Sequence, residues 1–186
     1  MNMDEGRHVT QPDQIAARFE IMDCIHRYCH AVDRRRWSLM ESVFHEDATY
    51  KFFSIEGTWR DFVAQAKALI DPIGPTHHQV SNIMVRFEGE VAHSETYLRA
   101  FHSVPEHYPP WTVFSIPGGG NILIGGRYVD RFERRDGIWR IAHRTGLLDW
   151  RQDLKQEDGG LARTPSVWRG RFGASDPSEP VVLPWL

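Results

Sequence analysis

The stretch NILIGGRYVDRFERRDGIWRIAHRTGLLDW, residues 121–150, decides the fold of this chain. Two long segments of strand-like composition, residues 121–134 and 138–150, flank the short turn Arg135-Asp136-Gly137. An Asp-Gly pair between two such segments is a strong signal for a β-hairpin. The stretch therefore predicts two long antiparallel strands joined by a tight turn.

A second hairpin is predicted upstream of this stretch. Residues 80–87 alternate in character, Glu88-Gly89-Glu90 suits a turn, and residues 91–104 return as another strand. Residues 105–120 are rich in proline and glycine, which indicates a loop between the two hairpins. The second half of the domain is therefore expected to form an antiparallel sheet.

Helices are predicted before these strands. Residues 13–33 carry apolar side chains at steps of three and four, residues 37–44 suit a short helix, and residues 61–69 suit a third helix capped by Asp61. Residues 48–53 have strand-like composition, and residues 57–60 suit a turn. This order predicts an α+β fold in which a curved, mostly antiparallel sheet wraps around three N-terminal helices. The apolar positions of the first helix are Ile15, Phe19, Met22, Ile25, Cys29 and Val32.

Composition narrows the class of protein. The 186 residues suit one core, with a domain over residues 1–150 and a C-terminal tail over residues 151–186. The tail contains apolar residues such as Trp168 and Phe172, so it is expected to pack on its own domain or on a neighbouring subunit. A net charge of −3 argues against nucleic acid or an anionic membrane as the main partner.

The cysteines and the N-terminus suggest a compartment. Cys24 and Cys29 lie five residues apart on one predicted helix and point in different directions, so no disulfide is expected between them. Residues 1–11 are polar, and no segment approaches the ~18 apolar residues of a membrane span. These features predict a cytoplasmic protein.

Two polar residues of the first helix are candidates for chemistry. Tyr28 and Asp33 fall on the apolar side of the helix, and a carboxylate that faces inward needs a partner. The alternative for Asp33 is a surface ion pair with Arg35 or Arg36. The run Arg34-Arg35-Arg36 is itself expected to form a solvated end that complements the helix dipole.

Further candidates come from the strands. His77 and His78 precede the first long strand, and because neighbouring strand residues face opposite ways, only one of them can point inward. Arg144 interrupts the last strand, where it could serve the site or form an ion pair across the sheet. Tyr50 and His102 are weaker candidates for the same cavity.

No cofactor is expected. His26 and His30 are four residues apart on the first helix, but no third ligand for a metal ion is apparent. Gly118-Gly119-Gly120 precedes a strand rather than a helix, which is the wrong context for a phosphate-binding loop.

Several motifs resemble a known family. They are Ile21-Met22-Asp23 with Asp33 ten residues later, residues 78–82 (HQVSN), residues 122–128 (ILIGGRY) and residues 133–139 (ERRDGIW). Together they are similar to the SnoaL-like branch of the NTF2-like superfamily, over roughly residues 12–150. The resemblance implies a cone-shaped α+β fold. The pattern is similar to that of hexachlorocyclohexane dehydrochlorinase, scytalone dehydratase and bile-acid 7α-dehydratase, which are cofactor-free eliminases with an Asp–His dyad.

The resemblance also implies roles for individual residues. It places the dyad on Asp33 and His78, which decides against His77. Arg144 falls where some members have an active-site arginine. Tyr28 matches a tyrosine of bile-acid dehydratase, whereas dehydrochlorinase has a lysine there, so a hydroxyl leaving group is favoured over a halide.

The remaining implications concern the pocket and the assembly. Tyr50 is similar to a pocket tyrosine of the dehydratases, and His102 to a second histidine of scytalone dehydratase. Members are commonly trimers, so a homo-oligomer, trimeric or dimeric, is expected. Phe53, Met84 and Trp111 are expected to line a pocket for a hydrophobic ring.

The expected function is therefore that of a cofactor-independent, dehydratase-like lyase acting on a steroid, terpenoid or polyketide-like ring. Two alternatives use the same cone. One is a ketosteroid-isomerase-like proton shuttle, and the other is a non-catalytic ligand-binding module similar to the small subunit of ring-hydroxylating dioxygenases.

Overall fold

The computed structural model describes residues 11–52, 55–110, 112–155 and 164–182. In chain order the elements are α1 (Pro12–Asp33), η1 (Trp37–Ser42), β1 (Phe44–Phe52), β2 (Ile55–Thr58), α2 (Trp59–Ile70), β3 (Thr76–Glu88), β4 (Val91–Val104), β5 (Gly120–Arg135), β6 (Ile138–Leu154), η2 (Ser166–Trp168), η3 (Gly173–Ser175) and α4 (Glu179–Val182). Helices in the first half and long strands in the second confirm the predicted α+β class.

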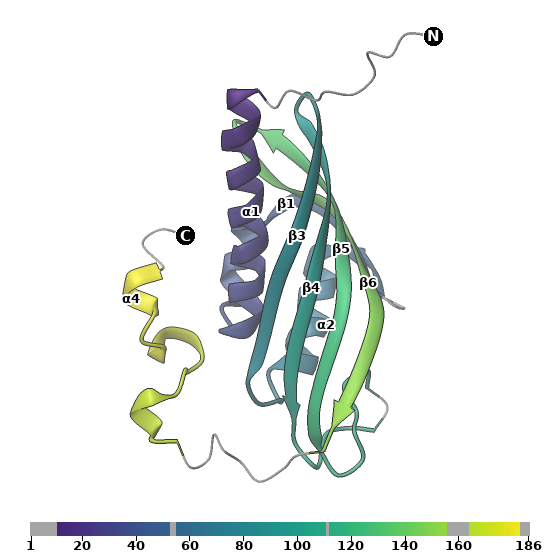
Figure 1. The fold of residues 1–186 in the computed structure, drawn as a ribbon, viewed down its shortest axis with the longest axis vertical. Coiled ribbons are helices and arrows are strands. Elements are labelled where there is room, and N and C mark those ends of the chain that lie inside the picture. The colour runs from purple at the N-terminus through teal and green to yellow at the C-terminus, as the bar shows by residue number, and fades with distance from the viewer. Residues whose placement is uncertain (1–10, 53–54, 111, 156–163, 183–186) are drawn as a thin grey trace.

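One curved sheet holds all six strands, in the order β2-β1-β6-β5-β4-β3. Every neighbouring pair is antiparallel except β1 and β6, which run parallel. In Figure 1, α1 runs along β3 while α2 lies behind the long strands. The sheet and the helices enclose the space in which the core and the cavity lie.

The predicted hairpin at Asp136 forms as expected. Arg135 of β5 pairs with Ile138 of β6, and the two residues between them take positive φ, 52° at Asp136 and 78° at Gly137. Two positive φ values characterise the turn that best matches the twist of a β-hairpin. The strand β6 then continues to Leu154, four residues past the predicted end.

The first half contains three differences from the sequence predictions. Residues 37–44 are not one helix, because the 3₁₀ turn η1 ends at Ser42 and Phe44 already begins β1. The predicted turn at residues 57–60 is instead the end of β2 and the start of α2. The cap of α2 is Thr58, whose Oγ accepts a hydrogen bond from the backbone N–H of Asp61, so Asp61 is the third residue of the helix.

The apolar stripe of α1 is correct only in its second half. Ile25 is buried, but Ile15 and Phe19 are 49% and 62% exposed. Arg18 takes the sheet-facing position in the first half, where its guanidinium donates to the Val85 carbonyl. In the first half of α1 the apolar side chains of the predicted stripe therefore do not face the sheet.

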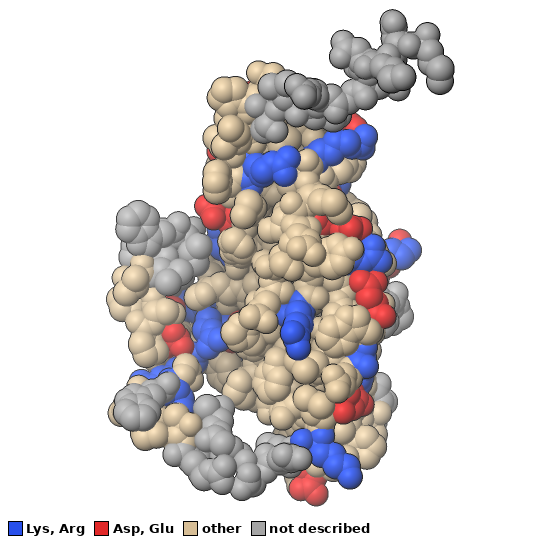
Figure 2. Space-filling model, viewed as in Figure 1, with Lys and Arg blue, Asp and Glu red and all other residues tan. Residues whose placement is uncertain are grey.

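Charged side chains are distributed over the surface. Figure 2 shows acidic and basic residues interspersed on the face formed by the long strands. Among the helices of the described residues, none has the length and apolar character needed to cross a membrane.

Candidate active site

The end of α1 and the start of β3 bring Asp33 and His78 together. The Nδ1–H of His78 donates to Oδ1 of Asp33 over 2.7 Å, and the backbone N–H of His78 donates to Oδ2 over 2.7 Å. Thr76 adds a third hydrogen bond, from its hydroxyl to Oδ1 over 2.9 Å. An acceptor-only carboxylate at Nδ1 requires the proton on that nitrogen, so in the neutral ring Nε2 has the lone pair.

The geometry of β3 selects one of the two histidines. Thr76 and His78 are two residues apart, so both side chains lie on the face toward α1. His77, between them, is exposed. Arg35 reaches the backbone carbonyl of Asp33 rather than its carboxylate. The surface ion pair considered for Asp33 is therefore not the arrangement that forms.

Asp33 is anionic at neutral pH in this setting. Its residue is only 7% exposed, and burial raises the pKa of a carboxyl group. The hydrogen bonds and charge of His78, together with the Thr76 hydroxyl, act in the opposite direction and hold the pKa of Asp33 at about 2. A carboxylate held this way can stabilise positive charge on the His78 ring.

The ring of His78 lines an apolar cavity of about 120 Å³. Polar groups enter this cavity at only a few places, namely at His78, His102 and a group of tyrosines that includes Tyr28 and Tyr50. Most of the wall is hydrophobic and includes Val32, Phe52, Phe62, Leu98, Phe114 and Leu147. Such a wall with a few convergent polar groups is typical of a small-molecule site.

Two tyrosine hydroxyls meet inside the cavity. Tyr28 of α1 and Tyr50 of β1 are buried, and their oxygens lie 3.2 Å apart. Burial raises the pKa of Tyr28, and the nearby guanidinium of Arg144 lowers it by less. Burial also raises the pKa of Tyr50. Both phenols are therefore protonated at neutral pH and can donate hydrogen bonds.

Arg144 lies behind the tyrosines and does not line the cavity. Its guanidinium packs on the rings of Tyr28 and Tyr128, at 4.3 and 4.1 Å from the ring centres. It also forms a two-point ion pair with Asp130, with N–O distances of 2.7 and 2.8 Å. The two residues are direct neighbours across β5 and β6, so the cross-sheet ion pair considered from the sequence is the arrangement that forms.

His102 is the second histidine of the cavity. It is fully buried in β4, its ring is perpendicular to that of His78 at 5.4 Å, and its Nδ1 has no hydrogen-bond partner among the described residues. Burial, followed by the neighbouring His78, lowers the pKa of His102 to about 3. His102 is therefore a neutral imidazole at physiological pH.

The prediction that Met84 lines the pocket is wrong. Met84 is 57% exposed and lies on the outer face of β3. The regular pairing of β3 with β4 is interrupted between Ser81 and Met84, and Asn82 in this interval has a φ of 49°. Such a bulge reverses which residues face inward, so Ile83 is turned toward the core instead.

Two other predicted lining residues, Phe53 and Trp111, lie outside the described residues. Phe52 lines the cavity next to the position predicted at Phe53. Sequence reasoning missed Asp130 and Tyr128, two of the partners of Arg144. Their alternation with Phe132 along one strand was the available signal for an inward-facing group.

A second, polar groove of about 480 Å³ lies on the other side of the Asp33–His78 pair. Its wall includes His26, His30 and His77. Within the described part of the chain, no three His, Cys, Asp or Glu side chains are grouped so that they could hold a metal ion.

Comparison with known proteins places the chain in a family. The sequence profile of the SnoaL-like domain matches residues 13–145. The chain belongs to the SnoaL-like domain family. Hexachlorocyclohexane dehydrochlorinase 1 of Sphingobium indicum is 25% identical over 143 residues, which cover 74% of this chain and 85% of that protein. Distant relatives of this SnoaL-like protein are thus dehydrochlorinases, which are lyases.

Solved structures share the fold. A hexachlorocyclohexane dehydrochlorinase of type 2 superposes with a TM-score of 0.66 at 21% identity, covering 83% of this chain and 97% of that one. A putative scytalone dehydratase from Novosphingobium aromaticivorans gives a TM-score of 0.61 at 19% identity, covering 77% of this chain and 91% of that one. Both confirm the NTF2-like cone predicted for this SnoaL-like chain.

Proposed function

We propose that this SnoaL-like protein is a cofactor-independent lyase of the dehydratase type, with Asp33 and His78 as its catalytic dyad. The supporting observation is the 2.7 Å hydrogen bond from His78 Nδ1 to buried Asp33 at the wall of an apolar cavity. A histidine held in one tautomer by a carboxylate is suited to general base catalysis. The wall around it suits a hydrophobic substrate.

In this mechanism His78 removes an acidic proton from a carbon next to a carbonyl group. The electron pair of the C–H bond moves into an enolate, whose oxygen accepts hydrogen bonds from the Tyr28–Tyr50 pair. Neutral phenols suit this role because they donate hydrogen bonds without losing their protons. Asp33 stabilises the imidazolium that forms.

The second step expels the leaving group. The enolate electron pair forms the new C=C bond as the C–O bond to the β-hydroxyl breaks. The imidazolium of His78 gives its proton to the departing oxygen, so one water molecule leaves and the base is restored. Arg144 does not line the cavity and acts through Tyr28. Its positive charge lies 4.3 Å from the centre of the Tyr28 ring. No external oxidant or cofactor is needed for the balance.

The cavity volume favours a single ring as substrate. An apolar cavity of about 150 Å³ accepts benzene, and the volume here is about 120 Å³. A single ring close to the size of benzene suits this volume, whereas the four fused rings of a steroid exceed it. His102, neutral and facing the same cavity, is suited to bind a second substrate oxygen.

The test separates proton removal from elimination. Cyclohexanone in deuterium oxide reports the base alone, because each proton removed next to the carbonyl is replaced by deuterium. A second substrate, 3-hydroxycyclohexanone, reports elimination as the loss of water by mass spectrometry. His78→Ala and Asp33→Asn are expected to lower both rates, His78→Ala by roughly 10²–10⁴-fold. His77→Ala, the exposed neighbour, is the matched control.

The outcomes distinguish the competing functions. Deuterium exchange without loss of water, with a shifted double bond in an unsaturated ketone, would point to an isomerase. Binding of the ketones without exchange would point to a ligand-binding module. Equal rates for His78→Ala and His77→Ala would reject the proposed dyad.

A further inference from the structure

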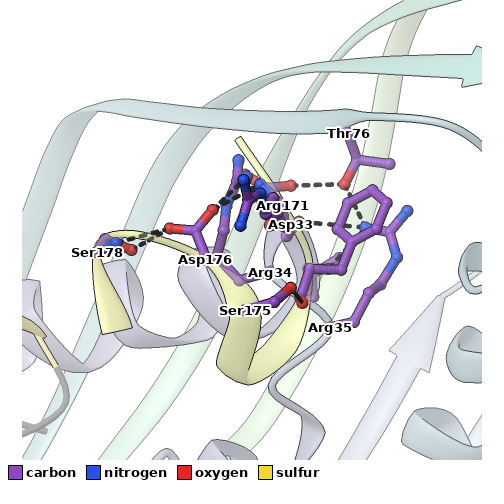
Figure 3. Close-up of polar contacts among 10 residues, drawn as sticks. Asp33, Arg34, Arg35, Thr76, Arg171, Ser175, Asp176 and Ser178 are labelled. Carbon is purple, nitrogen blue, oxygen red and sulfur yellow. Dashed lines mark hydrogen bonds and ion pairs between the residues drawn. The ribbon is translucent and has the colours of Figure 1, made fainter. Parts of the chain in front are cut away.

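The C-terminal segment contacts the end of α1, close to Asp33 (Figure 3). The backbone N–H of Gly173 donates to the carbonyl of Arg34 over 2.7 Å, which satisfies a carbonyl left open at the helix end. Arg34 lies 3.8 Å from a carboxylate oxygen of Asp176, and Arg36 forms an ion pair with Glu179. The arginine run predicted to be solvated is instead the surface on which this segment lies.

Arg35 occupies a backbone position that normally selects glycine. The N–H of Arg36 donates to the carbonyl of Ala31, and the N–H of Arg35 donates to that of Val32, which together form a Schellman motif. The residue at its turning point takes left-handed φ, here 57° at Arg35. A side chain larger than glycine is disfavoured there, so the arginine needs a compensating role.

The guanidinium of Arg35 contacts three parts of the molecule. It donates to the carbonyls of Val32 and Asp33 in α1, and to the carbonyl of Gly74 just before β3. It also donates to the hydroxyl of Thr76 over 2.9 Å. On its other side it packs on the ring of Phe172, 4.3 Å from the ring centre. One side chain thus ties the helix end, the strand start and the C-terminal segment together.

The hydroxyl of Thr76 links Arg35 to the carboxylate of Asp33. A hydroxyl has one proton, and Thr76 gives it to Oδ1 of Asp33. The Thr76 oxygen then has lone pairs for the N–H of Arg35, which holds the hydroxyl in the orientation that points its proton at Asp33. The hydrogen bonds run in one direction, from Arg35 to Thr76 to Asp33.

Asp176 shapes the segment that holds Phe172 in place. Its carboxylate accepts hydrogen bonds from the backbone N–H of Arg171 and from the N–H and hydroxyl of Ser178. The residue is 7% exposed. These bonds fold residues 171–178 into a compact turn that presents the Phe172 ring to Arg35.

We propose that Arg35, clamped by residues 171–179, is a positioning residue that fixes the orientation of Asp33 and thereby the tautomer of His78. Residues 171–179, called the clasp below, then hold the dyad in position. This inference depends on the proposed function only for its consequence in catalysis, because the effect on the His78 ring is measurable without a substrate.

The test uses the full chain with nitrogen-15-labelled histidine. The ring-nitrogen shifts of His78, assigned by comparison with His78→Ala, report which nitrogen holds the proton at a pH where the ring is neutral. Arg35→Gly keeps the left-handed backbone but removes the guanidinium, so the fold is expected to persist. It should convert the single Nδ1–H form of His78 into a mixture of tautomers. Phe172→Ala should do so to a smaller extent, and Val167→Ala, an exposed residue of the tail, should not.

Thr76 provides the decisive pair of variants. Thr76→Val removes the hydroxyl at nearly constant shape and should produce the same mixture, while Thr76→Ser should restore the single tautomer. A single Nδ1–H form in both Arg35→Gly and Thr76→Val would overturn the proposal. If either variant fails to fold, the Phe172→Ala spectrum decides, and an unchanged spectrum there rejects the clasp.

Deuterium exchange then measures the consequence for catalysis. Arg35→Gly should lower kcat by about 10-fold or more with little change in KM, as for other outer contacts that orient a catalytic group. In the Asp33→Asn background it should have no further effect. If the tautomer changes but wild-type protein exchanges nothing, the clasp stands and the proposed lyase function fails. If exchange depends on His78 but not on Arg35, the catalytic role of His78 stands and the positioning role of Arg35 fails.

Discussion

Asp33 and His78 are joined twice, because one carboxylate accepts both the ring N–H and the backbone N–H of the same histidine, each over 2.7 Å. The first bond fixes the ring and the second fixes the strand that carries it. The last residue of α1 is thereby locked to the third residue of β3. These two hydrogen bonds connect the end of a helix to the start of a strand. The relative position of Asp33 and His78 is therefore determined by the packing of α1 against β3.

The first prediction is that Asp33 stabilises the fold in a pH-dependent manner. Its pKa is lowered from 3.8 to about 2, although burial alone would raise it. A lowered carboxyl pKa stabilises the folded state fully above pH 4, and this contribution disappears as the pH falls toward 2. A shift of this size corresponds to about 2 kcal/mol.

Urea unfolding of wild type and Asp33→Asn between pH 2 and pH 7 measures this contribution. The difference in unfolding free energy should be largest above about pH 4 and should shrink toward pH 2. A difference that stays constant over the whole range would mean that the charge of Asp33 contributes nothing to stability.

The second prediction concerns the tyrosine pair. Tyr50→Phe removes one of the two hydroxyls that meet at 3.2 Å and keeps the ring stacked on Phe62. If the pair stabilises an enolate, kcat for deuterium exchange should fall by roughly 10²-fold. The pH profile of the wild type should show no tyrosine ionisation between about pH 6 and 9, because burial raises the pKa of Tyr50. Tyr97→Phe, on the outer face, is the control that should leave the rate unchanged.

The third prediction separates the roles of Arg144 in stability and chemistry. Arg144→Met leaves the buried carboxylate of Asp130 without its partner, which should lower the unfolding free energy by about 3–5 kcal/mol. The double variant Arg144→Met/Asp130→Leu should recover much of that loss. Chemical denaturation measures both values, and Lys51→Met, in an exposed ion pair with Glu56, should change stability by less than about 1 kcal/mol.

Recovery of stability without recovery of deuterium exchange would assign Arg144 a role in the reaction as well. A double variant that regains both stability and activity would limit Arg144 to the scaffold.

The sequence predicts those parts of the fold whose signals are local. The Asp136-Gly137 turn and the alternation along β4 need no information from distant residues. The phase of each element against its neighbours does need such information. Ile15 is exposed because α1 contacts the sheet through Arg18 in its first half. Met84 is exposed because the bulge at Asn82 changes which side chains of β3 face inward.

The candidate site shows the same division. Tyr28 and Asp33 could be placed on the inner side of α1 from spacing alone, but the choice of His78 over His77 required a family resemblance. The alternatives for Arg144 could not be separated, because its partner Asp130 is a neighbour across the sheet and is 14 residues away in the chain. Arg35 was expected to be solvated or to pair with Asp33, and its contact with Phe172 could not be predicted because the two residues lie far apart in the chain.

The fourth prediction tests whether the cavity is the binding site. Ala66 of α2 lines the cavity, so Ala66→Phe should fill much of a volume of about 120 Å³. Ala68 is exposed on the same helix, so Ala68→Phe adds the same side chain outside the cavity. A monocyclic ketone should raise the melting temperature of wild type and of Ala68→Phe, because a ligand that binds only the folded state stabilises it. In Ala66→Phe this increase should be lost, together with deuterium exchange. Equal ligand-induced shifts of the melting temperature in the two phenylalanine variants would mean that the ketone binds outside this cavity. His78 would then be too far from the ketone to act as its base.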